Sequence, residues 1–180
     1  MAVWLTTRQS VWCWPTGLLN VGLSALVFLH SRLYGSAALQ LVYVALCLYG
    51  WHQWLHGGAG EGRLEVSRTP ARWLAGLAVV GSAFALGLGL FLRYRTDAAL
   101  PFWDASMTAF SLAAQWMTTR KWIENWLVWI PVDAVYVAMY LSQRLQAYAG
   151  LYAVFLVLAV FGYRGWRRSL AAATTDEVAA

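Results

Sequence analysis

Four side chains on one face of the apolar stretch 123–141 have the chemistry of a small-molecule binding site. They are an amide, an indole, a carboxylate and a phenol, at steps of four, four and three residues: Asn125, Trp129, Asp133 and Tyr136. That spacing places them on one side of a helix. Trp and Tyr rings attract cations and stack on heterocycles, while Asn and Asp bind hydroxyl groups. The pattern favours a flat, charged, hydrogen-bonding solute; the alternative is helix packing with aromatic residues at the membrane interface.

Asp133 is the most informative of the four because it lies near the centre of its apolar stretch. An ionised carboxylate at that depth costs about 2.5–3.5 kcal/mol on insertion scales. No Lys or Arg occupies the centre of any apolar stretch, so the sequence offers no basic partner. We expect Asp133 to face a cavity; the alternative is a protonated Asp that forms a hydrogen bond between helices.

Six further residues are candidates for the same binding site because they are polar or aromatic within or beside apolar stretches. They are Gln115, Trp126, Asn20, Gln40, Tyr43 and Trp14. Trp14 and Asn20 fall in the region of the first half that matches the polar face of 123–141. An amide in lipid costs free energy unless it is partnered, so a cavity wall would account for these amides. Taken singly, each of them could also form a hydrogen bond with a neighbouring helix.

The elements that carry these residues are expected to be membrane-spanning helices. The chain is 61% hydrophobic and 12% charged, whereas about a quarter of the residues of a soluble domain are charged. Apolar stretches of about 20 residues, the length of a helix that crosses a bilayer, recur along the chain. We predict an all-α integral membrane protein with spans at 15–31, 33–55, 73–92, 101–117, 123–141 and 146–163.

The chain repeats itself in one register, without a gap: position n of the first half matches position n + 112 of the second. Between 2–54 and 114–166, 15 of 53 positions are identical, and Gly50 and Trp54 fall on Gly162 and Trp166. Chance similarity between two apolar stretches would not keep one register over this length. We interpret the repeat as a duplicated unit, and duplicated units that face each other across a central cavity are common in transporters. Residues that match in this register are called equivalent below.

The repeat predicts a 3+1+3 arrangement of transmembrane helices. In chain order, we expect a first three-helix repeat at 1–55, a solvated cytoplasmic loop at 56–72, a linker transmembrane helix at 73–92, a second repeat at 101–166 and a cytoplasmic tail at 167–180. Because one linker helix returns the chain to its starting side, the repeats should be parallel, related by an axis along the membrane normal. Only the last part of 101–117 has an equivalent in the first half, so we expect the first helix to be truncated in this sequence.

The basic residues are distributed as expected for a multi-pass membrane protein. If successive span ends alternate between the two sides, nine Lys and Arg lie on one side and four on the other. The richer side should be cytoplasmic, which places the C-terminus inside. We therefore assign the net charge of +5 to topology and to contact with anionic lipid, and expect no nucleic-acid partner.

No metal, cofactor or catalytic motif is expected. Cys13 and Cys47 lack metal-ligand spacing and have apolar neighbours, which favours small buried side chains. His52 and His56 stand four apart without a third ligand nearby. The aspartates lack the context of an aspartyl protease, and neither Gly-x-Ser-x-Gly nor His-Glu-x-x-His occurs. An intramembrane enzyme, a purely structural protein and an ion-coupled transporter are the weaker alternatives.

Five motifs occur in a fixed order along the chain. They are Trp14-Pro-x-Gly17-x-x-Asn20, Leu39-Gln40-x-x-Tyr43, Gly50-Trp51-x-x-Trp54, Arg120-Lys121-x-x-Glu124-Asn125-Trp126-x-x-Trp129-x-x-x-Asp133 and Gly162-Tyr163-x-x-Trp166. With these motifs the chain resembles the PnuC family of bacterial vitamin transporters, from residue 2 to about 168. The long central motif is the specific one.

The resemblance implies a seven-helix 3+1+3 fold in the bacterial inner membrane, often assembled as a homotrimer with a path through each protomer. It also implies facilitated diffusion of a vitamin for NAD biosynthesis, made directional by phosphorylation in the cytoplasm. Nicotinamide riboside is the first expectation, and thiamine or another vitamin or nucleoside is the alternative. Asp133 and Trp129 would then hold the pyridinium ring. The hydroxyl groups and the carboxamide would go to three amides: Asn125, Gln115 and Gln40.

Overall fold

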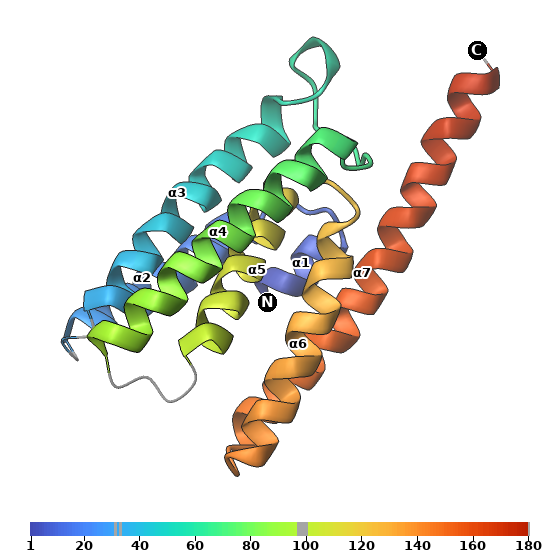
Figure 1. Ribbon diagram of the computed structural model, residues 1–180. Helices are drawn as coiled ribbons and strands as arrows, with labels where there is room; N and C mark the ends of the chain where they lie inside the picture. Colours follow the sequence, from blue (N-terminus) through green and yellow to red (C-terminus); the bar gives the residue numbers. More distant parts are fainter. Residues whose placement is uncertain (31, 33, 97–100, 180) are drawn as a thin grey trace.

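The described part of the chain is built almost entirely of helices. The structure, a computed structural model, describes residues 1–30, 32, 34–96 and 101–179 (Figure 1). Within these residues the elements are α1 Ala2–Thr7, α2 Cys13–His30, α3 Tyr34–His56, the 3₁₀-helix η1 Ala59–Glu61, α4 Ala71–Arg95, α5 Pro101–Thr119, α6 Asn125–Ser142 and α7 Gln146–Ala179. The one β-type pairing among them is a bridge between Ser67 and Trp122. The predicted all-α class is confirmed.

Long helices occupy the six stretches for which a span is predicted, although α7 continues to Ala179. Positions 31 and 33, where two predicted spans end and begin, lie outside the described residues, as does position 180 of the predicted tail. By length and composition, α2, α4 and the part of α7 up to Ala173 are able to cross a membrane.

The other long helices, α3, α5 and α6, contain most of the polar candidate residues, which lower their mean hydropathy. They have 23, 19 and 18 residues. At a rise of 1.5 Å per residue they are about 27–35 Å long, close to the thickness of a bilayer core. Their length therefore fits the predicted spans.

The two copies of the sequence repeat have matching helix bounds and matching junctions. α2 and α6 begin and end at equivalent residues, α3 and α7 begin at equivalent residues, and α1 and α5 end at equivalent residues. The junctions match as well, because Gln9 and Lys121 both have φ 54°, and Arg32 and Arg144 have φ 57° and 59°. A left-handed residue after a helix ends it and turns the chain. We refer to α1–α3 as the N-terminal half and to α5–α7 as the C-terminal half.

Two equivalent hydrogen bonds join the two halves. Trp54 Nε1 of α3 donates to Thr118 O of α5 over 3.0 Å. Trp166 Nε1 of α7 donates to Thr6 O of α1 over 3.1 Å. The two donors are equivalent residues, and so are the two acceptors. Consequently α3 packs on α5 and α7 packs on α1, so each half contributes a helix to the packing of the other.

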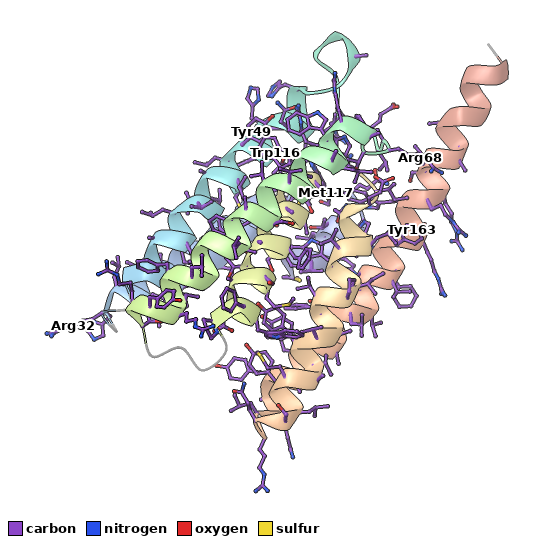
Figure 2. The ribbon with its side chains drawn as sticks, viewed as in Figure 1. Arg32, Tyr49, Arg68, Trp116, Met117 and Tyr163 are labelled. Atoms are coloured by element: carbon purple, nitrogen blue, oxygen red, sulfur yellow. The ribbon has the colours of Figure 1, made fainter. Side chains whose placement is uncertain are left out.

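Helix α5 is held between α3 and α4. Tyr49 of α3 stacks on Trp116 of α5 (Figure 2), with ring centroids 5.3 Å apart. Trp73 of α4 approaches the same indole, with centroids 6.1 Å apart. Farther along α4, Gly89 is buried so closely against Phe102 of α5 that a Cβ there would overlap the ring. Small residues allow helices to approach closely in lipid, so α4 is fixed on α5 by packing.

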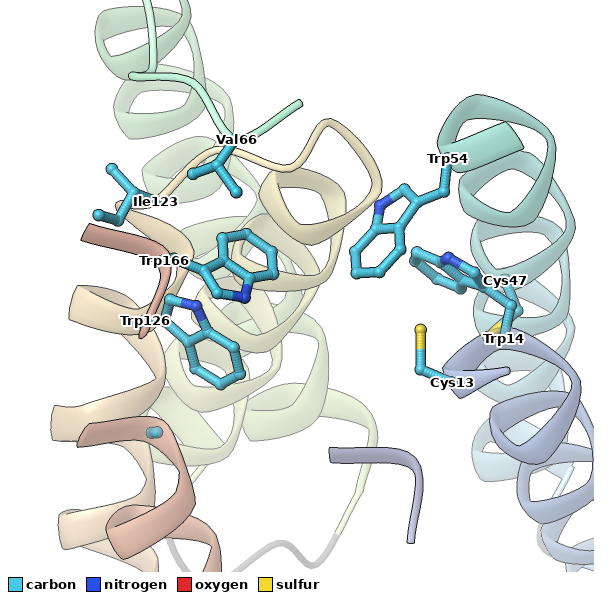
Figure 3. Packing of buried hydrophobic residues seen from close by; sticks show 9 residues of the cluster. Cys13, Trp14, Cys47, Trp54, Val66, Ile123, Trp126 and Trp166 are labelled. Carbon is cyan, nitrogen blue, oxygen red and sulfur yellow. The ribbon is translucent and has the colours of Figure 1, made fainter. Parts of the chain in front are cut away.

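The buried core contains the same tryptophan–glycine contact in each half (Figure 3). One tryptophan packs on the backbone of a glycine and stands edge-on to a second tryptophan, with ring centroids 5.4 Å apart: Trp14, Gly50 and Trp54 in the N-terminal half, and Trp126, Gly162 and Trp166 in the C-terminal half. A Cβ at either glycine would overlap the neighbouring indole. These contacts explain why the two glycines and four of the tryptophans keep their register in the sequence.

The stretch between α3 and α4 is fixed against the junction of α5 and α6. Glu124 Oε2 accepts hydrogen bonds from Thr69 N over 2.8 Å and from Thr69 Oγ1 over 2.7 Å. Lys121 Nζ donates to Leu64 O over 2.7 Å, and Val66 is buried in the core. The predicted loop is exposed over most of its described residues, and Lys121 and Glu124 attach it at Leu64 and Thr69.

Lys121 gives this junction a dependence on pH. Its ammonium group lies 4.7 Å from the Trp54 ring centroid, and burial lowers the pKa of Lys121 from 10.5 to about 8. Between these values the unfolded chain binds more protons than the folded one, so stability rises with pH. We expect the unfolding midpoint of the wild type to rise relative to that of Lys121→Met as the pH goes from 8 to 10. Thermal unfolding in detergent measures this difference. Arg120→Met is the control and should give a constant difference; a constant difference for Lys121→Met would contradict the prediction.

Candidate functional site

A cavity of about 390 Å³ lies between the two halves. Nine of the ten residues predicted to bind a solute line it: Asn125, Trp129, Asp133, Tyr136, Gln115, Trp126, Asn20, Gln40 and Tyr43. Cavities that bind small molecules have volumes of about 300–1,000 Å³. The predicted face of α6 therefore lies on a cavity of suitable size, and α2, α3 and α5 each contribute polar side chains to it.

Both halves line the cavity at equivalent positions. Five pairs of equivalent residues belong to the lining: Val3 and Gln115, Thr6 and Thr118, Val21 and Asp133, Gln40 and Tyr152, and Tyr43 and Phe155. The wall is therefore symmetric in position but not in chemistry. The C-terminal half places a carboxylate and an amide where the N-terminal half has two valines. A solute bound between the halves meets polar groups on both sides, and the carboxylate of Asp133 on one side.

Eight lining residues were not predicted from the sequence: Val3, Thr6, Val21, Ser111, Thr118, Tyr152, Phe155 and Ala159. Four of them are the equivalents of predicted residues. Val3 and Val21 correspond to Gln115 and Asp133, and two aromatic residues of α7 correspond to Gln40 and Tyr43. Applying the register of the repeat to the predicted set would have found these four.

Trp14 is the predicted site residue that the structure places elsewhere. Its side chain is 2% exposed and belongs to the hydrophobic core, where it packs on Gly50 and Trp54. It is not among the residues that line the cavity. Its equivalent Trp126 makes the same core contacts and also reaches the cavity wall. The match to the polar face of 123–141 suggested a ligand contact for Trp14, but its ring is used for packing.

Asp133 lies in the cavity wall without a charged partner. Its side chain is 5% exposed, and no hydrogen bond or ion pair joins its carboxylate to another residue in the described ranges. Its equivalent in the other half is Val21, so nothing across the wall repeats its charge. A buried charge is costly unless something pairs with it. A cationic group in the cavity would pair with this carboxylate.

Asn125 adds an amide to the same cavity wall, about two helical turns before Asp133 on α6. The side chain is fully buried, and Nδ2 donates to Trp122 O over 2.6 Å. Because a carbonyl can only accept, this bond fixes which end of the amide is the oxygen. Oδ1 has no hydrogen-bond partner among the described residues, and neither has Trp126 Nε1. Two residues of the wall thus each keep one buried polar atom unpaired, an acceptor and a donor.

The described residues contain no group of three or more His, Cys, Asp and Glu able to hold a metal ion. Cys13 and Cys47 are buried free thiols in the core. The His52 and His56 rings lie 5.1 Å apart. The cavity is built from a carboxylate, amides, hydroxyl groups and aromatic rings, a set suited to binding an organic molecule.

Two similar helical halves that enclose such a cavity have the form of a small-solute membrane transporter. The chain belongs to the nicotinamide mononucleotide transporter family, whose family model matches residues 1–168. Its relatives carry transporter names, and the protein is a transporter of this PnuC family, not an enzyme.

Three curated relatives illustrate the range of the family. The nicotinamide riboside transporter PnuC of Escherichia coli is 28% identical over 194 residues, covering 94% of this chain and 81% of that protein. The riboflavin/roseoflavin transporter RibM of Streptomyces davaonensis is 29% identical over 162 residues, covering 88% and 76%. PnuC of Neisseria mucosa is 26% identical over 163 residues, covering 84% and 62%. The crystal structure of the vitamin B3 transporter PnuC has the same fold, with a TM-score of 0.72 and 21% identity over 94% of this chain and 77% of that one.

Proposed function

We propose that this transporter carries nicotinamide riboside. The observation that carries the proposal is the buried carboxylate of Asp133, which lines the cavity without a basic partner among the described residues. Nicotinamide riboside has a flat pyridinium cation and a hydroxylated ribose. The cation would pair with Asp133 and stack on Trp129, since indole faces attract cations. The name of the Escherichia coli relative supports the same substrate.

The remaining polar groups suit the riboside and the carboxamide. Asn125 Oδ1 accepts a hydrogen bond from a hydroxyl group, and Trp126 Nε1 donates one to an oxygen. Gln115 and Gln40 lie on the same cavity from opposite halves. Each amide both donates and accepts, so these two bind hydroxyl groups or a carboxamide. The solute is thereby held in one orientation, with its ring toward α6.

Riboflavin is a second candidate, because the RibM relative is a riboflavin/roseoflavin transporter. Aromatic rings around the cavity would stack on an isoalloxazine ring. That ring is neutral, however, and leaves Asp133 without a counter-charge. Thiamine is cationic and aromatic, so it satisfies Asp133 as nicotinamide riboside does.

We further infer a 3+1+3 arrangement in the bacterial inner membrane. Residues 1–55 and 101–166 are parallel repeats, 73–92 is the linker helix, and the basic C-terminal side is cytoplasmic. The matching helix bounds and the doubled Trp–Thr hydrogen bond support the repeats. Transport is facilitated diffusion, in which the halves rock about the central cavity and phosphorylation in the cytoplasm traps the vitamin. Each protomer of a homotrimer has its own path.

A comparison of ligands tests the substrate. Calorimetry of the purified protein with nicotinamide riboside, thiamine, riboflavin and uridine should show saturable binding that is tightest for nicotinamide riboside. Uptake into liposomes should equilibrate without accumulation, with or without a proton or sodium gradient. Binding of riboflavin but not of nicotinamide riboside would overturn the proposed substrate. Gradient-driven accumulation would overturn facilitated diffusion.

A further inference from the structure

Four tyrosines on α6 and α7 form a continuous row of ring contacts that begins in the cavity wall. We call Tyr136, Tyr152, Tyr140 and Tyr148 the tyrosine row. The ring centroids of Tyr136 and Tyr152 are 4.7 Å apart, those of Tyr152 and Tyr140 are 5.3 Å apart, and those of Tyr140 and Tyr148 are 5.4 Å apart. The first two tyrosines line the cavity. The row therefore leads from the cavity toward the turn between α6 and α7, at the end of the bundle opposite the C-terminus (Figure 1).

The row ends in solvent or at the membrane surface. Tyr148, in the first turn of α7, is 55% exposed, whereas Tyr140 is half-buried. Tyr136 and Tyr140 are four residues apart on α6, and Tyr148 and Tyr152 are four apart on α7. Each pair thus occupies one helix face, and the faces meet. A flat molecule at Tyr148 has aromatic surface at every step to the cavity.

The repeat indicates that the row is not required for packing. Tryptophans that pack the core, such as Trp126 and Trp166, have tryptophan at the equivalent positions of the N-terminal half. The equivalents of the four tyrosines are Ser24, Gln40, Phe28 and Ser36. Only one of these is aromatic, although α2 and α3 pack together as α6 and α7 do. The row exists only in the half that carries the charged wall of the cavity.

Charge and ring chemistry along the row suit a cationic heterocycle. Tyr136, at the inner end of the row, lines the cavity together with the carboxylate of Asp133. Tyrosine faces attract cations and stack on flat rings, so a pyridinium gains similar contacts at each position. Interfacial tyrosines that only anchor a helix need no such mutual contact.

We propose that the tyrosine row is a stacking path for the substrate, with Tyr140 and Tyr148 as an outer subsite that receives the flat nitrogen heterocycle before it enters the cavity. This inference rests on the proposed function, because it takes its ligand from the cavity. It assigns a role in substrate capture to residues outside the cavity. The outer subsite raises the rate of entry at low substrate concentration, and the cavity sets the equilibrium affinity.

The test compares Tyr148→Leu, which removes the ring, with Tyr148→Phe, which keeps it. Uptake of labelled nicotinamide riboside into liposomes should show kcat/KM lowered about three- to tenfold in Tyr148→Leu, with kcat and the calorimetric Kd of the cavity within about twofold of wild type. Tyr148→Phe should transport within about twofold of wild type. Phe161→Leu removes an exposed aromatic of α7 outside the row and should change nothing.

Unchanged kcat/KM in Tyr148→Leu would overturn the stacking path, as would an equal loss in Phe161→Leu. An equal loss of calorimetric affinity in Tyr148→Leu would also overturn the stacking path, because the substitution would then have changed the structure of the cavity. Failure of the proposed substrate is seen separately, in the wild type. If wild type transports riboflavin or thiamine instead, the same variants measured with that vitamin decide for or against the row. If wild type carries none of these solutes, both proposals fall.

Discussion

Replacing Asp133 with Asn is expected to weaken the binding of nicotinamide riboside by about 10- to 150-fold. The substitution keeps the shape of the side chain and removes its charge. A hydrogen bond or contact to a charged group contributes about 1.5–3 kcal/mol, and about 1.4 kcal/mol corresponds to tenfold in affinity. Asp133 is 5% exposed, so little water screens the interaction. Calorimetry of the purified variant measures the loss.

Two controls separate charge from shape. The reduced riboside has the same sugar but an uncharged ring, so wild type and Asp133→Asn should bind it within about threefold of each other. Val21→Asn introduces the same amide at the equivalent position and should leave the affinity for the cationic form within about threefold. The unfolding midpoint of Asp133→Asn should not fall, because the change removes a buried charge. A loss of affinity below twofold would show that Asp133 does not bind the cation.

Replacing Gly162 with Ala is expected to destabilise the protein and to weaken substrate binding. The new Cβ would overlap the Trp126 indole, which is 2% exposed and held edge-on against Trp166. On the side away from the cavity the ring is packed against Trp166, and overpacking of this kind costs about 1–3 kcal/mol. Trp126 also lines the cavity, so its displacement should lower the affinity several-fold. Thermal unfolding and calorimetry measure the two effects.

The repeat supplies a matched pair for this experiment. Gly50→Ala should cost similar stability, because its Cβ would overlap Trp14, but it should leave affinity nearly unchanged, since Trp14 does not line the cavity. Gly150→Ala lies on α7 in open space and should be neutral or slightly stabilising, as Ala favours a helix over Gly by about 1 kcal/mol. Equal midpoints for Gly162→Ala and Gly150→Ala would contradict the packing account.

The sequence predicted the long helices and much of the cavity wall for physical reasons. Apolar stretches of bilayer length have few folding alternatives to a helix, so their positions followed from hydropathy. The steps of four, four and three placed four residues on one face, and the structure puts that face on the cavity: Asn125, Trp129, Asp133 and Tyr136. Gln40 and Gln115, each predicted as a separate polar residue, line the same cavity from different helices.

Other features could not be predicted because they depend on which helices meet. Trp14 and Trp126 are equivalent residues and gave the same prediction, but in the structure only Trp126 reaches the cavity wall. Read singly, Tyr152 and Phe155 resemble lipid-facing aromatics, and only their equivalence to Gln40 and Tyr43 in the repeat indicates the cavity. The loop between α3 and α4 carries glycines and charges, and its attachment depends on the distant Glu124.

The difference between Val21 and Asp133, which are equivalent residues of the two halves, has a consequence for how vitamin preference evolves. Each half of the protein is packed by the same contact, in which a tryptophan ring lies on the backbone of a glycine. Five lining residues lie on α6, so under the proposed function we expect substitutions there to change substrate preference most. Its counterpart α2 contributes only Asn20 and Val21 to the described lining, so it presents fewer side chains to a solute.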